Sequence, residues 1–454
     1  MIVSFSVSNF RSFSSEETLS LVASNSLSGH DEHAVPIPDS KEKVLRAAVI
    51  YGANGAGKSN VFKALRYLES VALRPRGKNS GTGRKPFRFA EAEAQSVPST
   101  FDLQFIAGDK LYRFGFKVDD ERITEEWLFQ VVGNRQRRLY ERTTDENGKV
   151  AVDAGGLKDA GEKVRALATV GGPQNQSFLA TVNATLAASD SGGELDQVLT
   201  WFTESLMLIG PDAPFMALGH HLEQDPDFLS FAGAYLKSAS TGVDHLEVVK
   251  KEISKDELGR LLPDSLVSKV LRDLAEDEDG AVTRRLGEGK ELLVQRKGDD
   301  HFYLINVQAA HEHKPGEAVR MELTEESDGT RRLLNLIPAL HNPCVYFIDE
   351  IDRSLHPILV KEFLGFFLKS CGGVSRQIIV TTHESNLLDQ DLLRRDEIWF
   401  AEKDQTAATR LYSLLDFKVR NDRDIRKGYL QGRFGAVPYL GSLEHLLAKT
   451  DRPE

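Results

Sequence analysis

Apolar and polar residues alternate in short segments through the first third of the chain. In Met1–Ser8, 101–105 and 112–116 apolar residues recur at every second position, which is the period of a strand with one buried face. Ala107-Gly108-Asp109 lies between the last two segments and predicts a tight turn. We therefore expect residues 1–150 to contribute an antiparallel sheet.

After residue 150 the apolar residues recur every three or four positions. Segments 194–208 and 227–238 show this spacing, which predicts amphipathic helices and a mainly helical insertion over residues 151–290. From 291 to 454 strand-like apolar runs alternate with helical patterns, as in a parallel sheet. The three regions together predict an α/β protein with a parallel-sheet core, an antiparallel β subdomain and a helical insertion.

Residues 52–59 read Gly-Ala-Asn-Gly-Ala-Gly-Lys-Ser, the pattern of a phosphate-binding P-loop. The apolar run 47–51 before them predicts a buried strand, and apolar residues after them have helical spacing. This context disfavours the alternative, a glycine-rich turn that matches by chance. Glycines let backbone N–H groups face phosphate oxygens, and the helix adds the positive end of its dipole.

We expect ATP contacts from Asn54, Gly55, Ala56, Gly57, Lys58, Ser59 and Asn60. Among them, Lys58 can reach the β- and γ-phosphates, and the Ser59 hydroxyl can ligate Mg²⁺.

Two carboxylates follow an apolar run later in the chain. Asp349 and Glu350 come directly after Val345–Ile348, and ligands of open α/β sheets bind at the carboxyl ends of strands. Asp349 is therefore expected to hold Mg²⁺ and Glu350 to polarise the water that attacks the γ-phosphate. Acidic residues also follow strands as helix caps, and by itself the pair leaves that alternative open.

His383 directly follows the next apolar run, 377–382. A neutral imidazole there can hydrogen-bond the γ-phosphate or the attacking water. A polar surface residue is the competing interpretation, which the proximity to the carboxylate strand disfavours. Lys58, Glu350 and His383 are thus the predicted catalytic residues.

Composition narrows the classes of function. The 57 basic and 68 acidic residues give a net charge of −11, which disfavours bulk attraction to nucleic acid and makes any DNA contact local. Only Cys344 and Cys371 are present, too few for a disulfide framework or a cysteine-based metal site. No apolar run approaches the roughly 20 residues of a membrane helix, and the N-terminus lacks a signal-peptide pattern. We expect a cytoplasmic protein without a membrane contact.

Three weaker patterns favour surface structure over a site. Segment 74–88 is basic and rich in Gly and Pro, which fits contact with nucleic acid or an acidic partner but is more typical of a solvated loop. His311 and His313 share one face of a strand, yet a zinc site needs three or four ligands. The third pattern is a group of arginines near the C-terminus that are candidate contacts for phosphate or an effector: Arg423, Arg426 and Arg433.

The N-terminal motif resembles the heads of ABC ATPases of the SMC and RecF type. Residues 9–13 read Asn-Phe-Arg-Ser-Phe, similar to the opening of those heads. In the family this element lies close to the nucleotide, which makes Arg11 a candidate nucleotide contact. Gln104 is the candidate for the Q-loop glutamine.

Three later motifs extend this resemblance. Residues 326–331 resemble a variant ABC signature that keeps Ser327 and Gly329, 351–357 resemble the D-loop, and His383 stands where the switch histidine would be. The resemblance implies an ATP-gated dimer in which Ser327 and Gly329 contact the γ-phosphate bound by the partner chain. Loss of that phosphate on hydrolysis would loosen the dimer.

A narrower resemblance is to the RloA/AbiL-like ATPases of abortive-infection and restriction-linked loci, and to the PARIS defence ATPase. It includes the motifs above. Its most specific motif is Tyr429–Pro438, which reads Tyr-Leu-Gln-Gly-Arg-Phe-Gly-Ala-Val-Pro. It implies a homodimer or higher homo-oligomer, a separate effector nuclease of the TOPRIM type and a phage protein as trigger. Overcoming-lysogenization-type proteins carry that nuclease in the same chain, and too few residues follow His383 for such a domain here.

Three functions therefore compete. The first is an ATP-driven switch of an anti-phage defence system. The second is a RecF- or SMC-like ATPase of DNA repair or maintenance that binds DNA directly. The third, the motor of a membrane transporter, is disfavoured by the opening motif and by the departure of the signature from Leu-Ser-Gly-Gly-Gln.

Overall fold

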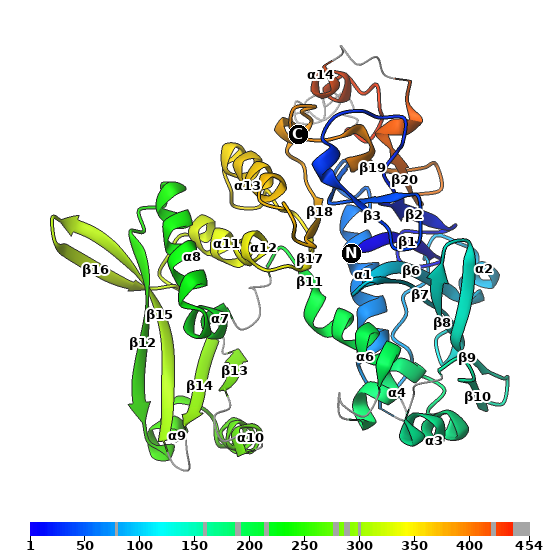
Figure 1. The fold of residues 1–454 in the computed structure, drawn as a ribbon, viewed down its shortest axis with the longest axis horizontal. Coiled ribbons are helices and arrows are strands. Elements are labelled where there is room, and N and C mark those ends of the chain that lie inside the picture. The colour runs from blue at the N-terminus through cyan, green and yellow to red at the C-terminus, as the bar shows by residue number, and fades with distance from the viewer. Residues whose placement is uncertain are drawn as a thin grey trace, which may run out of the picture. The chain divides into compact units, whose positions relative to one another are not determined.

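The computed structural model describes nine ranges of the chain, which divide into two compact units. Unit 1 comprises Met1–Leu208, Pro343–Ile351 and Cys371–Glu454, and unit 2 comprises Ile209–Asn342 and Asp352–Ser370. The described ranges are 1–77, 80–157, 161–186, 192–212, 218–275, 281–285, 291–297, 301–418 and 424–438. Figure 1 labels most of the helices and strands of both units.

A six-stranded sheet forms the centre of unit 1, in the order β11-β17-β18-β5-β19-β20. β5 pairs in parallel with β18 and β19, β18 pairs in parallel with β17, and only the β19–β20 pairing is antiparallel among these. β5, β17 and β18 are buried at every residue, which explains their continuous apolar sequences. The bounds are β11 Leu206–Ile209, β17 Val345–Ile348, β18 Gln377–Thr381, β5 Ala47–Tyr51, β19 Ile398–Lys403 and β20 Thr409–Ser413.

Helix α1 (Lys58–Leu73) packs its apolar face into the core of unit 1. Its Phe62 ring meets Phe347 of β17 edge-on at a centroid distance of 5.5 Å. The buried face repeats at three- and four-residue intervals through Val61, Phe62, Leu65 and Leu68, as the sequence predicts. The helix is thereby fixed directly after β5, with its N-terminus at the phosphate loop.

A seven-stranded sheet in the order β10-β9-β8-β7-β6-β1-β2 forms the second layer of unit 1. Its pairings are antiparallel, and β6 alternates strictly between buried and half-buried residues. The strands predicted at 101–105 and 112–116 pair as Phe101 with Phe116 and Phe105 with Tyr112. The bounds are β1 Ile2–Ser8, β2 Glu17–Ser20, β6 Ser99–Ala107, β7 Lys110–Val118, β8 Ile123–Val132, β9 Arg135–Thr144 and β10 Val150–Asp153.

Short elements complete unit 1. The helices are α2 Ala92–Ser96, α3 Glu162–Val170, α4 Phe178–Thr185, α6 Gly193–Thr200, the π-helical turn η2 Trp201–Ser205 and α14 Ile425–Leu430. The 3₁₀ turns are η1 Asp31–His33, η4 Ser385–Leu387, η5 Arg395–Glu397 and η6 Leu414–Asp416, and β3 (Ala34–Pro36) pairs with β4 (Lys43–Leu45).

Unit 2 combines an antiparallel sheet with helices. Its sheet has the order β12-β15-β14-β13, with β16 also on β15. The strands are β12 His245–Ile253, β13 Ala281–Arg285, β14 Glu291–Lys297, β15 His301–Lys314 and β16 Glu317–Glu322. The helices are α7 Leu218–Gln224, α8 Pro226–Ser238, α9 Lys255–Leu261, α10 Asp264–Ala275, α11 Asp328–Leu336, α12 Pro338–His341 and α13 Pro357–Lys369.

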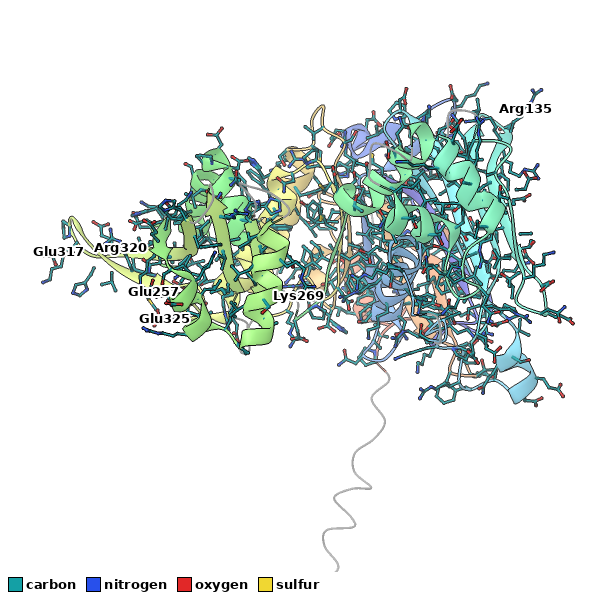
Figure 2. All side chains as sticks on the ribbon, turned by 90° about the horizontal axis from the view of Figure 1, so that it is seen from below. Arg135, Glu257, Lys269, Glu317, Arg320 and Glu325 are labelled. Carbon is teal, nitrogen blue, oxygen red and sulfur yellow. The ribbon has the colours of Figure 1, made fainter. Side chains whose placement is uncertain are left out.

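The structure differs in three ways from the sequence expectation. The predicted helix 194–208 ends at Ser205, because residues 206–208 belong to strand β11, whereas the predicted helix 227–238 is present as α8. Residues 151–290 also contain β12 and β13, and the hairpins of 291–322 belong to unit 2 rather than to the parallel sheet. The reason is visible in β12, where the consecutive residues Lys250, Lys251 and Glu252 are charged and exposed, so that its sequence lacks a clear period of two. Figure 2 labels Glu317 and Arg320 on the equally charged β16. No helix in the described ranges is long and apolar enough to cross a membrane.

Candidate nucleotide-binding site

The phosphate loop links β5 to α1 through backbone conformations that glycine adopts easily. Gly55 and Gly57 have φ values of 79° and 109°, in the left-handed region that disfavours side chains. A Cβ at Gly57 would also overlap the Thr409 hydroxyl and come within 2.9 Å of the Ser12 hydroxyl, whereas one at Gly55 would meet nothing within 4 Å. Gly57 therefore packs closely against Thr409 and Ser12. Gly55 lies on the exposed side of the loop with Asn54.

Lys58 is held inside the loop at 5% exposure. Its ammonium donates to the carbonyl oxygens of Gly52 and Ala53 at 2.8 and 3.2 Å and lies 3.5 Å from His383 Nδ1. The structure thus brings together two predicted catalytic residues that are 325 positions apart. His383 itself is exposed, so its ring is accessible to a ligand at the loop.

The acidic pair is held by one threonine at the end of the neighbouring strand. The Thr381 hydroxyl donates to Asp349 Oδ1 at 2.6 Å and accepts from the Glu350 backbone N–H at 2.8 Å. Asp349 is 1% exposed, while Glu350 is half-buried and has φ 51°. Because β18 lies between β17 and β5, this threonine connects the carboxylates to the strand beside the phosphate loop.

The N-terminal motif contacts the phosphate loop through Ser12. The Ser12 hydroxyl accepts from Asn60 Nδ2 at 2.8 Å and lies 2.8 Å from the Thr409 hydroxyl, which donates to the Ala56 carbonyl oxygen at 2.8 Å. The buried face of the loop is therefore supported by β20 and by the chain's first segment. Ser59, the predicted magnesium ligand, is half-buried in the first turn of α1.

Arg11 lies in the same N-terminal motif with φ 53°. Its guanidinium carbon lies 5.6 Å from the Phe10 ring centroid, and its backbone N–H donates to the Lys85 carbonyl oxygen at 2.7 Å. Its Nε is buried and has no acceptor within the described part of the chain. Burial, followed by the nearby Arg88, lowers the pKa of Arg11. Such a guanidinium fits an anionic ligand, because a phosphate oxygen would supply the acceptor that Nε lacks.

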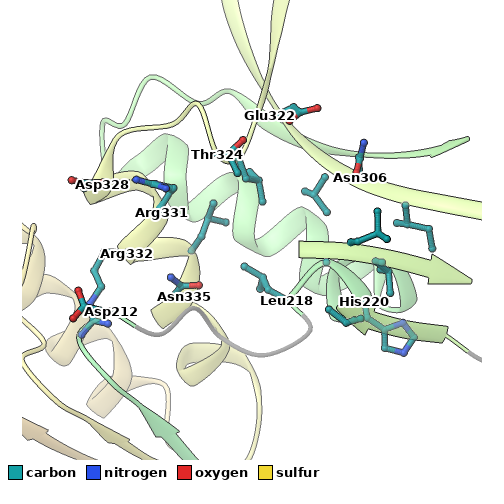
Figure 3. Close-up of a pocket in the computed structure, with 18 of the residues that line it drawn as sticks. Asp212, Leu218, His220, Asn306, Glu322, Thr324, Asp328, Arg331, Arg332 and Asn335 are labelled. Atoms are coloured by element: carbon teal, nitrogen blue, oxygen red, sulfur yellow. Dashed lines mark hydrogen bonds and ion pairs between the residues drawn. The ribbon is translucent and has the colours of Figure 1, made fainter. Parts of the chain in front are cut away.

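The signature-like residues belong to unit 2. Ser327 is the N-cap of α11, accepting from the Thr330 N–H at 3.1 Å. Gly329 lies in the first turn, where an added Cβ would come within 3.0 Å of the Ser354 carbonyl oxygen in the D-loop-like segment. In that segment Arg353 pairs with Asp212 at 2.6 Å. The α11 N-terminus therefore packs against this segment within unit 2, beside the pocket that Figure 3 shows.

The remaining candidates lie in ordinary structural settings. Gln104 is in the middle of β6, opposite Ser4 and Arg113. His311 bonds to the buried Glu326 at 2.6 Å rather than forming a pair with His313. Arg433 is exposed and Arg426 is exposed on α14, and Arg423 lies outside the described residues.

The basic segment 74–88 contains buried residues, whereas its composition favours a solvated loop. Arg84 is 7% exposed, pairs with Asp120 at 2.6 Å and donates to the carbonyl oxygens of Val97 and Gln95. Lys78 lies outside the described residues. The Arg84 side chain therefore stabilises the packing of this segment and is not a solvent-exposed surface charge.

Sequence reasoning did not single out three residues that build the site. Thr381 stands in the Thr-Thr-His run before His383, so its place at a strand end beside the histidine was a usable signal. Ser12 lies inside the recognised N-terminal motif. Thr409 reaches Ala56 across 353 positions, and no local pattern marks it.

A family model described as "AAA domain, putative AbiEii toxin, Type IV TA system" matches residues 47–389. No curated protein sequence matches the chain.

Among solved structures, the SMC head bound to the C-terminal winged-helix domain of ScpA is similar at 13% identity. This alignment covers 91% of this chain and 97% of that one, with a TM-score of 0.39. The SMC head domain of Thermotoga maritima has 13% identity, 91% and 98% coverage and a TM-score of 0.32. The corresponding values for an SMC head from Pyrococcus furiosus with an extended coiled coil, bound to the C-terminal domain of ScpA, are 12%, 95%, 98% and 0.33.

Proposed function

The chain belongs to the AAA-domain family described as a putative AbiEii toxin of type IV toxin–antitoxin systems, and on that premise we propose that it is an ATP-hydrolysing switch of an anti-phage defence system. In this proposal two or more copies associate around ATP. The nucleotide state then controls a separate effector, a nuclease of the TOPRIM type, in the bacterial cytoplasm, and a phage protein acts as the trigger.

The observations that support the ATPase proposal are the contact of His383 with the phosphate loop and the position of the acidic pair at the end of the neighbouring strands. Lys58 lies beside His383, and Thr381 connects Asp349 and Glu350 to the adjacent strand. A buried lysine, a buried aspartate and an accessible glutamate are what a triphosphate site with a metal ion and an activated water requires. Structural helix caps do not account for this convergence.

The residues of the site fit Mg²⁺ and ATP. Ser59 and Asp349 offer the oxygen ligands that Mg²⁺ prefers, and the metal would neutralise charge on the β- and γ-phosphates. The backbone N–H groups of 54–60 and the Lys58 ammonium would bind phosphate oxygens. Arg11 would add a charge-assisted hydrogen bond through its buried Nε.

Glu350 would accept the proton of the attacking water, and His383 would orient that water or the γ-phosphate. In the proposed dimer, Ser327 and Gly329 of one chain face the phosphate loop of another. The helix N-terminus formed at Ser327 suits this role, because the positive end of the helix dipole attracts an anion. Hydrolysis removes the γ-phosphate and with it the contact that holds the two chains together.

The ATPase proposal is tested by two variants of the full chain. Lys58→Ala is expected to lose ATP binding in calorimetry. Glu350→Gln is expected to bind ATP and to hydrolyse it about 10²–10⁴-fold more slowly, the usual contribution of a general base. Glu312→Gln, an exposed residue of β15, is the control for an acid-to-amide change. Wild-type turnover by the Glu350 variant would remove this residue from the mechanism.

The defence proposal needs a separate test, because an ATPase can serve other pathways. The natively expressed chain is purified with its companions in the Glu350→Gln form, and the companions are identified by mass spectrometry. A nuclease that co-purifies in the presence of ATP supports the proposal. Strong, ATP-dependent and salt-sensitive DNA binding by the purified chain alone would instead favour a RecF- or SMC-like role.

A further inference from the structure

A second group of possible metal ligands lies in unit 1, in the segment that connects β2 to β3. His30, Glu32 and His33 each offer one ligand atom, and these atoms lie within 4.8 Å of one another. One oxygen, Glu32 Oε1, lies 3.6 Å from His30 Nδ1 and 3.7 Å from His33 Nε2. None of these residues takes part in the nucleotide site described above.

The second nitrogen of each imidazole is already engaged by an acceptor. His30 Nε2 lies 2.8 Å from the Gln390 carbonyl oxygen, which can only accept, so Nε2 carries a proton. His33 Nδ1 lies 3.1 Å from both carboxylate oxygens of Glu397, a residue with 0% exposure. In the neutral rings the lone pairs are therefore on His30 Nδ1 and His33 Nε2, the two atoms that face Glu32.

This arrangement is the one that proteins use to orient metal-binding histidines. A ligating imidazole donates its other N–H to a carbonyl or carboxylate, which fixes the tautomer and the ring direction. Here both kinds of acceptor are present, Gln390 for His30 and Glu397 for His33. A cation beside these three atoms would be attracted by the Glu32 carboxylate and could accept the two lone pairs, whereas a second proton on either imidazole would give an ion pair instead.

The spacing fits a tetrahedral metal. Zinc binds histidine nitrogen and carboxylate oxygen at about 2.0–2.2 Å, which places neighbouring ligand atoms about 3.4 Å apart in a tetrahedron. The separations of Glu32 Oε1 from the two histidine nitrogens, 3.6 and 3.7 Å, need a contraction of a few tenths of an ångström. The two nitrogens lie within 4.8 Å of each other, and a rotation of the stacked imidazole rings would bring them closer. Glu32 has a side chain that is 65% exposed, which leaves room for a water molecule as the fourth ligand.

We propose that His30, Glu32 and His33 bind one Zn²⁺ ion, which fixes the positions of the two imidazoles in the turn between β2 and β3. Two nitrogens and one carboxylate favour zinc over Mg²⁺, which prefers an all-oxygen shell. The ligands come from the N-terminal part of unit 1, and their supports, Gln390 and Glu397, come from the C-terminal part. The ion would bind residues of this turn alone, and the hydrogen bonds of its two histidines would link the turn to regions more than 350 residues away.

Neighbouring contacts hold the ligands in place without using their ligand atoms. Arg46 Nε donates to the backbone carbonyl oxygen of Glu32 at 3.1 Å, and the Arg46 N–H donates to the His33 carbonyl oxygen at 2.7 Å. His30 has φ 51°, a conformation that costs free energy in a residue with a side chain. These contacts fix the backbone of the turn and hold the three side chains close together.

The test measures zinc bound to the full, nucleotide-free chain after equilibrium dialysis, with metal content determined by mass spectrometry. The wild-type chain is expected to bind one Zn²⁺ that excess Mg²⁺ does not displace. His30→Ala and Glu32→Gln are each expected to weaken binding more than about 100-fold, beyond the usual loss from changing a supporting residue. His313→Ala removes an exposed histidine of β15 and is expected to bind like the wild type.

Two further results decide between a metal site and a group of ion pairs. Co²⁺ in place of zinc is expected to give the visible absorption of a tetrahedral complex, which Glu32→Gln abolishes. Because Glu32 is largely exposed, this variant folds even if a change at the buried His33 does not. Stoichiometric zinc that survives both His30→Ala and Glu32→Gln, or no zinc bound by the wild type, would overturn the proposal and leave hydrogen-bonded ion pairs only.

Discussion

At the scale of single residues, Thr381 contacts both residues of the acidic pair. Its one hydroxyl donates to Asp349 and accepts from the Glu350 N–H. Glu350 has φ 51°, a conformation that costs of order 1–2 kcal/mol in a residue other than glycine. The hydrogen bond to its backbone offsets part of that cost, so the hydroxyl fixes the Asp349 carboxylate and the Glu350 backbone.

Replacing Thr381 with valine keeps the shape of the side chain and removes the hydroxyl. Asp349 is almost fully buried and would lose a donor, so we expect a loss of about 1–3 kcal/mol in the free energy of unfolding. ATPase activity should fall and the Mg²⁺ concentration for half-maximal activity should rise. Denaturant unfolding and a magnesium titration measure these effects. Thr381→Ser retains the hydroxyl and should restore both; equal magnesium dependence in all three proteins would contradict this role.

At the scale of elements, local patterns predict the parts of the site that are continuous in sequence. The apolar strands β5, β17 and β18, the glycines of the phosphate loop and the helical period of α1 are all visible in the sequence, and the structure contains each. The support of the loop by Ser12 and Thr409 was not predictable, because it depends on contacts across 48 and 353 positions. The sheet of unit 2 was missed because charged residues interrupt the strand period in β12.

The C-terminal segment Tyr429–Pro438 carries a motif that the sequence analysis singled out, but its position in the fold was not predicted. Phe434 is 6% exposed and lies 6.0 Å from Phe400 of β19, while Tyr429 of α14 stacks on Phe400 at 5.8 Å. The Tyr412 hydroxyl donates to the Phe434 carbonyl oxygen at 2.8 Å. Within unit 1, this segment covers the strands β19 and β20, and β19 also approaches Gly52 through Ala401.

Removing the aromatic ring at Phe434 tests whether this cover stabilises the nucleotide-binding sheet. Phe434→Ala is expected to reduce the free energy of unfolding by about 3–5 kcal/mol, as for other buried phenylalanines, and to weaken ATP binding. Leu430→Ala changes a residue that is 61% exposed and should have little effect. Thermal unfolding with and without ATP measures both. An unchanged melting temperature for Phe434→Ala would show that the segment is not coupled to the fold of unit 1.

At the scale of the whole molecule, the proposed ATP site draws on both units. Lys58, Asp349 and Glu350 belong to unit 1, whereas Ser327 and Gly329 belong to unit 2. In the proposed dimer each active site combines unit 1 of one chain with unit 2 of its partner. A two-fold symmetric dimer then contains two such sites, and the two halves of a site can be disabled on different chains.

Mixing two inactive variants distinguishes a site shared between chains from one within a chain. Lys58→Ala disables the phosphate loop. Ser327→Asp keeps a good N-cap for α11 while it places a negative charge where the γ-phosphate is expected, so each variant alone should be inactive. A mixed dimer carries both changes in one site and neither in the other, so an equal mixture should recover about a quarter of wild-type activity.

The recovered activity should require exchange of chains between dimers and should increase with incubation of the mixture. Ser327→Asn keeps the cap without the charge and serves as the control for the cap itself. If the signature residues acted on the phosphate loop of their own chain, every site in the mixture would contain one defect and no activity would return. Recovery therefore depends on the γ-phosphate linking two chains, which is the physical basis of the proposed switch.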